Sequence, residues 1–209
     1  MAVCYIVGAA GYCAPFTVTD EDLVIAADGG LCHLAARGIT PDFTVGDFDS
    51  LSTPPNGENV LTYPVEKDET DTMLAIKLAW EKGYRHFRLL AGTGGRTDHT
   101  LANLQALLWV ARRGGTAILC GERECFTSLN CGTLSFKKTA SGTLSVFAQG
   151  GEARGVTLRG VYYPLENGTL QPDFSLGVSN HFVGEPATVT VRDGALLLCW
   201  TGTADDLCF

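Results

Sequence analysis

The sequence lacks the features of several common protein classes. No apolar run is long enough to cross a bilayer. The stretch from Met1 to Gly8 has no basic leader, so it predicts a first strand rather than an export signal, and with it a cytoplasmic protein. Lysine and arginine number 15 against 23 aspartates and glutamates, which gives a net charge of −8. Because nucleic-acid binding demands clustered basic residues, we expect neither a nucleic acid nor a membrane as a partner.

Several site motifs are also missing. The eight cysteines form no Cys-x-x-Cys pair, so we interpret them as reduced thiols and not as a zinc or redox site. No Gly-Lys-Ser/Thr follows a glycine-rich stretch, which excludes a Walker loop. Gly8-Ala9-Ala10-Gly11 lacks the three glycines of the dinucleotide fingerprint.

The first half of the chain alternates short apolar runs with helical patterns. Apolar residues make up 45% of the sequence, which is enough to form a core. Because strands alternate with helices, we expect an α/β fold with a mostly parallel sheet covered by helices. Asp68 is the predicted cap of the second helix. Strands are predicted over 3–7, 23–27, 43–45, 86–91 and 116–120, and helices over 30–37, 70–82 and 97–113.

After about residue 121 the helical period ends, and short β-rich segments separated by Gly, Asn and Pro follow. Residues 143–148 and 188–191 are examples of predicted strands. Asp193-Gly194 lies between two apolar runs and is typical of a short hairpin turn. We therefore predict two domains, an α/β domain over 1–121 and an all-β domain over 122–209.

Aspartates recur after the predicted strands. Asp28, then Asp47 and Asp49, then Asp98 each follow a strand, and Asp71 opens a helix. The carboxyl ends of parallel strands meet at one edge of a sheet, where ligands bind. Taken singly, Asp28 and Asp47 could form turns and Asp71 could cap its helix. Converging carboxylates repel one another unless a cation lies between them, so we predict an Mg²⁺ site, with Asp47 and Asp49 as plausible ligands.

A phosphate-binding loop is predicted beside these carboxylates. Gly94 and Gly95 permit close approach of a backbone whose amides are exposed, and both precede a predicted helix. The guanidinium fork of Arg96 matches phosphate oxygens.

Six groups of residues resemble those of thiamine pyrophosphokinases, in the same order and at similar intervals across nearly the whole chain. They are Asp28-Gly29-Gly30, Gly46-Asp47-Phe48-Asp49-Ser50, Asp68-x-Thr70-Asp71, Gly95-Arg96-x-Asp98-His99, Gly160-x-x-Tyr163-Pro164-Leu165 and Gly177-Val178-Ser179-Asn180.

The resemblance implies a fold, an activity and an assembly. The activity would be transfer of the terminal diphosphate of ATP to the hydroxyl of thiamine, by attack on the β-phosphorus with AMP as the leaving group. The fold would be an α/β nucleotide domain followed by a β-sandwich. The assembly would be a homodimer with each active site shared between subunits. One departure is His181, where many bacterial relatives carry an acidic residue.

The resemblance also implies roles for individual residues. Asp47, Asp49 and Asp71 would hold Mg²⁺, and Arg96 would neutralise the transferred group. Either Asp28 or Asp98 would orient the thiamine hydroxyl or accept its proton, and the sequence does not separate them. Ser179 and Asn180 would bind thiamine, although a simple turn is the alternative. Nucleotide binding would fall to Gly29, Gly30, Thr70, Gly94, Gly95 and Arg96.

Two rival functions fit parts of the same pattern. A metal-dependent phosphohydrolase would use these carboxylates to activate water. A nucleotide or thiamine sensor would bind ligand without turnover, although the dense carboxylate set would then be superfluous. His99 could act as a base, but a structural role such as orienting Asn103 is favoured.

Overall fold

The computed structural model describes residues 1–48 and 55–208. The chain divides into two compact units, one of residues 1–106 and 119–122 and the other of residues 107–118 and 123–209. Helix α3 (Thr97–Ala111) and strand β6 (Thr116–Cys120) contribute residues to both units. Across the described ranges, no helix is both long enough and apolar enough to span a membrane.

The first unit is built on a parallel sheet, as its alternating pattern predicts. Its strands pair in the order β5-β1-β2-β3-β4, with every pairing parallel. All five residues of β2 are buried, which explains its continuous apolar sequence. The strands are β1 (Cys4–Val7), β2 (Leu23–Ala27), β3 (Phe43–Gly46), β4 (Val60–Thr62) and β5 (His86–Leu90).

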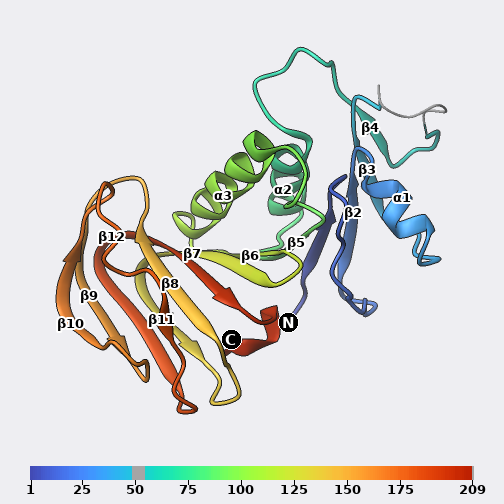
Figure 1. Cartoon of the computed structure of the whole chain (residues 1–209). Coiled ribbons are helices and arrows are strands. Elements are labelled where there is room, and N and C mark those ends of the chain that lie inside the picture. The colour runs from blue at the N-terminus through green and yellow to red at the C-terminus, as the bar shows by residue number, and fades with distance from the viewer. Residues whose placement is uncertain (49–54, 209) are drawn as a thin grey trace. The chain divides into compact units, whose positions relative to one another are not determined.

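Helices α1 (Gly30–Ala35) and α2 (Asp71–Glu81) cover this sheet. Helix α1 packs against β1 and β2, whereas α2 packs against β1, β2 and β3. Figure 1 shows the two helices on opposite faces of the sheet. The prediction that Asp68 caps α2 is wrong, because the hydroxyl of Thr70 accepts the hydrogen bond from the Met73 amide at 3.2 Å. Asp71 is the first helical residue, where a carboxylate complements the helix dipole.

The second unit consists mainly of antiparallel strands, which confirms the β-rich prediction. Two of its strands are long and pair along nearly their whole length. They are β7 (Glu124–Phe136), for which no range was predicted, and β12 (Ala187–Thr201), which extends beyond the predicted 188–191. The others are β8 (Thr143–Ala148), β9 (Ala153–Arg159), β10 (Leu165–Leu170), β11 (Asn180–His181) and β13 (Leu207–Cys208), with a short 3₁₀ helix, η1, at Ala204–Asp206.

The hairpin predicted at Asp193-Gly194 is wrong. Both residues lie inside β12, at a shift in its register with β7 between Val191 and Ala195. Gly194 has φ of 90°, and Cys131 on β7 has φ of 44°, so both strands are irregular at this point. Before the shift β12 pairs with β9, and after it β12 pairs with β8. The β7-β12 ribbon thus supplies strands to both layers of a sandwich.

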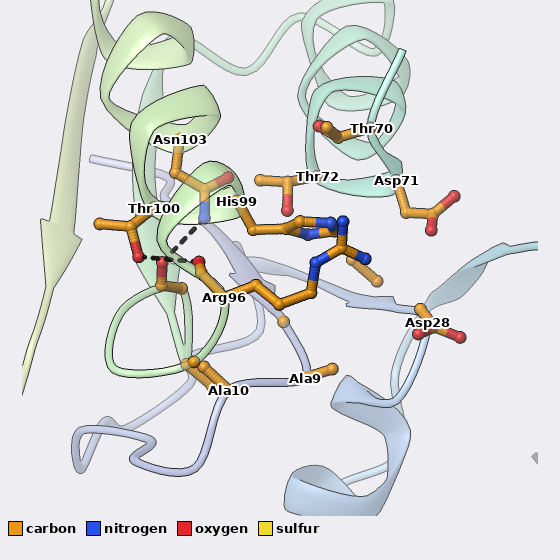
Figure 2. Close-up of a pocket in the computed structure, with 15 residues that line it drawn as sticks. Ala9, Ala10, Asp28, Thr70, Asp71, Thr72, Arg96, His99, Thr100 and Asn103 are labelled. Carbon is orange, nitrogen blue, oxygen red and sulfur yellow. Dashed lines mark hydrogen bonds between the residues drawn. The ribbon is translucent and has the colours of Figure 1, made fainter. Parts of the chain in front are cut away.

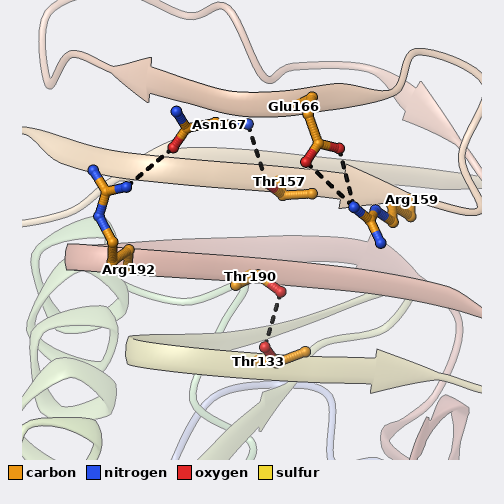
Figure 3. Close-up of polar contacts among 7 residues, drawn as sticks. All are labelled: Thr133, Thr157, Arg159, Glu166, Asn167, Thr190 and Arg192. Atoms are coloured by element: carbon orange, nitrogen blue, oxygen red, sulfur yellow. Dashed lines mark hydrogen bonds and ion pairs between the residues drawn. The ribbon is translucent and has the colours of Figure 1, made fainter.

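An aromatic contact between these layers is part of the core of the second unit. The ring of Phe136, on the later half of β7, meets that of Trp200, on the later half of β12, edge-on with centroids 5.4 Å apart. Both side chains are fully buried. Away from this core, polar pairs such as Thr133–Thr190 and Arg159–Glu166 bridge neighbouring strands (Figure 3). Val189 and Val191 are buried on either side of Thr190, the alternation expected of a strand with one face towards the core.

Candidate active site

A pocket of about 350 Å³ lies at the carboxyl ends of the strands of the first unit (Figure 2). Residues that follow β1, β2 and β5 meet there with the first turns of α2 and α3. Those lining the pocket are Gly8, Ala9, Ala10, Ala27, Asp28, Thr70, Asp71, Thr72, Ala91, Gly92, Gly95, Arg96, His99, Thr100 and Asn103.

The strand order explains this location. The chain leaves β1 and adds β2, β3 and β4 on one side, then returns to place β5 on the other side of β1. The connections after β1 and β5 therefore diverge, which opens a crevice between them. The loop after β1 was not predicted as part of the site, because it lacks the glycines of the dinucleotide motif. Its residues 8–10 nevertheless line the pocket.

Close backbone packing shapes the floor of the pocket. A Cβ atom on Gly30 would lie 1.8 Å from the carbonyl oxygen of Val7, so only glycine lets α1 begin this close to the end of β1. Asp28 has φ of 48°, and its amide donates to the Val45 carbonyl at 2.8 Å. A non-glycine residue in the left-handed region is strained, and such residues cluster at functional sites.

Side chains from two helices fix the loops around the pocket. The side-chain amide of Asn103 donates a hydrogen bond to the Gly92 carbonyl at 2.9 Å. Asn103 therefore orients the loop after β5, whereas His99 is exposed. On α1, the His33 ring bonds the Ala10 carbonyl at 2.6 Å. These contacts reduce the freedom of the pocket walls.

Two of the predicted metal ligands are joined by a lysine that the sequence analysis did not single out. The ammonium of Lys67 lies 3.0 Å from Oδ2 of Asp47 and 3.1 Å from Oδ1 of Asp71. The three side chains are 15%, 16% and 20% exposed, respectively. Asp71 lines the pocket, whereas Asp47 and Lys67 are not among its lining residues.

The surroundings disfavour a charged Asp71. Burial raises the pKa of this carboxyl, the positive charge of Lys67 opposes the rise, and the negative charges of Asp47 and Asp28 add to it. For Lys67, burial lowers the pKa, but its contacts with Asp47 and Asp71 outweigh burial and raise the pKa overall. The site thus concentrates more negative charge than one lysine offsets.

This charge imbalance fits a divalent cation. Oδ1 of Asp71 is buried and accepts no hydrogen bond from the part of the chain that the structure describes, although it pairs with Lys67. Such an oxygen is suited to a hard metal ion. Within residues 1–48 and 55–208, no three His, Cys, Asp or Glu side chains group as a metal site. Asp49, the third predicted ligand, lies outside the described residues.

Arg96 and Asp98 form an ion pair, but only Arg96 lines the pocket. The guanidinium of Arg96 donates from Nε to Oδ1 of Asp98 at 3.2 Å and from Nη2 to Oδ2 at 2.7 Å. This pairing raises the pKa of Arg96 and lowers that of Asp98. Arg96 lines the pocket and its side chain is 73% exposed, although Asp98 occupies the edge of the guanidinium formed by Nε and Nη2. Asp98 is not among the residues that line the pocket.

Only some of the other predicted nucleotide-binding residues line the pocket. Gly95 and Thr70 line the pocket, whereas Gly29, Gly30 and Gly94 do not. Gly30 acts through packing, as its contact with β1 shows. Gly94 has φ of 80°, which lets the loop turn into α3.

The predicted thiamine-binding residues lie in the second unit and differ in exposure. Ser179 is exposed and has φ of 60°, whereas Asn180 is 4% exposed. Oδ1 of Asn180 accepts hydrogen bonds from the amides of Tyr163 and His181, both at 2.9 Å. Its Nδ2 donates to the Tyr163 carbonyl at 2.7 Å. The side chain of Asn180 is therefore largely committed to the backbone, whereas Ser179 is exposed.

Comparison with known proteins gives a consistent result for both units. Residues 17–119 match the family model "Thiamin pyrophosphokinase, catalytic domain", and residues 133–196 match "Thiamin pyrophosphokinase, vitamin B1 binding domain". The chain is 29% identical over 188 residues to a thiamine pyrophosphokinase of Bacillus subtilis (strain 168), an alignment that covers 86% of this chain and 88% of that protein.

Solved structures agree with the sequence matches. A crystal structure of thiamine pyrophosphokinase from Bacillus subtilis superposes with a TM-score of 0.84 at 25% identity, covering 96% of this chain and 99% of that one. A family protein from Enterococcus faecalis gives a TM-score of 0.83 at 25% identity, covering 97% and 100%. Since both family models match in order and the fold agrees along the chain, the protein belongs to the thiamin pyrophosphokinase family of enzymes.

Proposed function

We propose that this enzyme transfers the terminal diphosphate of ATP to the hydroxyl of thiamine, with attack on the β-phosphorus and release of AMP. One observation carries the proposal. The pocket collects Asp28, Asp71 and Arg96 at the strand ends, and these three residues lie within the segment that matches the family's catalytic domain. Diphosphate transfer requires alignment of the reacting oxygens and neutralisation of phosphate charge more than covalent help from the protein.

The residues of the pocket suit the phosphates of ATP. The Gly95 backbone and the Arg96 fork border one wall, and the amino termini of α2 and α3 lie nearby. Asp98 contacts the Arg96 guanidinium through both carboxylate oxygens and so orients it. We assign Arg96 to charge neutralisation and Asp98 to its positioning.

Asp28 is the better candidate to accept the proton of the thiamine hydroxyl. It lines the pocket, whereas the carboxylate of Asp98 is engaged by Arg96 on both oxygens. Asp47 and Asp71, with Asp49 as a further candidate, would hold Mg²⁺. Bound there, the ion would supply positive charge against the phosphates.

A homodimer with shared sites is proposed for the assembly. The candidate carboxylates belong to the first unit and Ser179 to the second, and the second unit exposes large apolar side chains. These side chains include Tyr162, Tyr163, Phe174, Leu176 and Val178, which are between 40% and 67% exposed. The eight cysteines remain thiols, which is consistent with a cytoplasmic location, itself still a prediction.

Subunit mixing tests the shared site. An inactive Asp71→Asn protein is mixed with an inactive variant in which the exposed Ser179 carries a bulky residue, and subunit exchange is verified separately. A mixed dimer then collects both lesions in one site and none in the other. We expect about a quarter of wild-type activity, because about half the dimers are mixed and half their sites are intact. No recovery after verified exchange would contradict the shared site and leave the reaction untouched.

The nucleotide product tests the function itself. The protein is incubated with ATP, Mg²⁺ and thiamine, and the nucleotides are separated by chromatography. Thiamine-dependent AMP supports the proposal. ADP would indicate a monophosphate kinase, inorganic phosphate released without thiamine would indicate a phosphohydrolase, and no product would indicate a sensor.

A further inference from the structure

The environment of Lys67 is unusual for a lysine beside a candidate metal site. Its ammonium contacts Asp47 and Asp71 and also donates to the Pro64 carbonyl at 3.2 Å. The side chain is 15% exposed, which is low for a lysine that is not part of a strand or helix. The ammonium therefore occupies the space between the two carboxylates.

A divalent cation that lies between the two carboxylates would take the oxygens that Lys67 now contacts. Oδ2 of Asp47 and Oδ1 of Asp71 are the atoms that Lys67 contacts. A lysine ammonium and a divalent ion repel each other strongly at such short range. Both cations cannot lie between these oxygens at once.

The chain gives Lys67 freedom to leave. Its backbone precedes Thr70, the cap of α2, and lies in the connection between β4 and that helix. Asp71 is held in the first turn of α2, and Asp47 directly follows β3. The ammonium sits on a flexible four-carbon stem, so it can move while the carboxylates stay in place.

We propose that Lys67 is an internal cation that occupies the space between Asp47 and Asp71 before the metal arrives and competes with the divalent ion for them. It thus weakens metal binding in the absence of nucleotide. Once displaced, its ammonium becomes available to an anionic ligand in the pocket. The identity of the metal ligands rests on the proposed function, whereas the competition rests on the contacts of Lys67.

The first test measures binding of Mn²⁺ alone, followed by electron paramagnetic resonance, to the wild-type protein and to Lys67→Gln. We expect the variant to bind Mn²⁺ at least about tenfold more tightly, because the positive charge that competes for the two carboxylates is gone. Lys77→Gln is the matched control. Lys77 pairs with Glu69 and is 39% exposed, and neither residue lines the pocket. Its removal should leave Mn²⁺ affinity unchanged.

A purely structural role for Lys67 predicts the opposite sign, since loss of a supporting contact would disorder the ligands and weaken binding. Equal or weaker Mn²⁺ binding by Lys67→Gln would therefore overturn the inference. Tighter binding by Lys77→Gln to the same extent would also overturn it, because the effect would then be one of net charge.

A second measurement needs no variant and covers the case in which Lys67→Gln does not fold. Wild-type protein is treated briefly with an amine-acylating reagent, with and without Mn²⁺, and the modified lysines are quantified by mass spectrometry. We expect Mn²⁺ to increase acylation of Lys67 several-fold and to leave Lys77 unchanged. No increase in acylation of Lys67 when Mn²⁺ is bound would contradict displacement.

Formation of AMP reports on the reaction separately, so failure of the inference and failure of the proposed function are distinguishable.

Discussion

Replacing Asn180 with alanine separates a structural role from direct contact with thiamine. Three hydrogen bonds join the buried side chain of Asn180 to the backbone of Tyr163 and His181. Alanine would leave these backbone groups without their partner. Because a neutral hydrogen bond contributes about 1 kcal/mol net, we expect the free energy of unfolding of the second unit to fall by about 3 kcal/mol.

The assay is urea unfolding followed by tryptophan fluorescence, since Trp200 is fully buried in the same unit. Ser179→Ala is the control, because the Ser179 side chain is exposed and its removal should change stability by less than about 0.5 kcal/mol. If Ser179 binds thiamine, its alanine variant should raise the KM for thiamine alone. A stable Asn180→Ala protein with a raised thiamine KM would refute the structural role of Asn180.

Three further substitutions test the first unit. Asp71→Asn should lower kcat at least about 100-fold while the circular dichroism spectrum is retained, and near-normal kcat would remove Asp71 from the site. Arg96→Lys should lower kcat/KM at least about tenfold, since an ammonium cannot reproduce the guanidinium fork, and wild-type kinetics would show that Arg96 does not bind phosphate. Gly30→Ala should reduce the free energy of unfolding by about 1–3 kcal/mol or more, because the new methyl would overlap the Val7 carbonyl. Gly11→Ala, which meets nothing within 4 Å, should unfold like wild type, and an equal loss in both variants would contradict the packing argument.

Most strands and helices of the first unit were predictable because each is encoded locally, whereas β4 (Val60–Thr62) was not predicted. The residues of β2 form an apolar run that is buried along its whole length, and the prediction of 23–27 matches the structure. The prediction of the residue that caps α2 was wrong, because Asp68, Thr70 and Asp71 lie close together and all three are good capping residues. Only the backbone conformation selects Thr70.

The hairpin prediction failed for a non-local reason. Asp193-Gly194 has the sequence of a tight turn, but the same glycine also suits an irregularity inside a strand. The choice depends on pairing with β7, about 60 residues earlier in the chain, whose own irregularity at Cys131 accompanies that of β12. No local pattern contains that information.

The candidate site was predicted in part for related reasons. Aspartates at strand ends could be found because parallel strands place their carboxyl ends at one edge. The loop after β1 was missed because its role depends on strand order, which places β5 next to β1. Lys67 was missed because a lysine among acidic residues is typical of a solvated surface, and its burial between Asp47 and Asp71 appears only in three dimensions.

The fate of individual phosphates tests the central claim most directly. ATP radiolabelled at either the α or the γ phosphate is incubated with the protein, Mg²⁺ and thiamine. Attack on the β-phosphorus predicts that the γ label appears in thiamine diphosphate and that the α label remains entirely in AMP. A γ label found in thiamine monophosphate or inorganic phosphate, with the α label in ADP, would contradict diphosphate transfer.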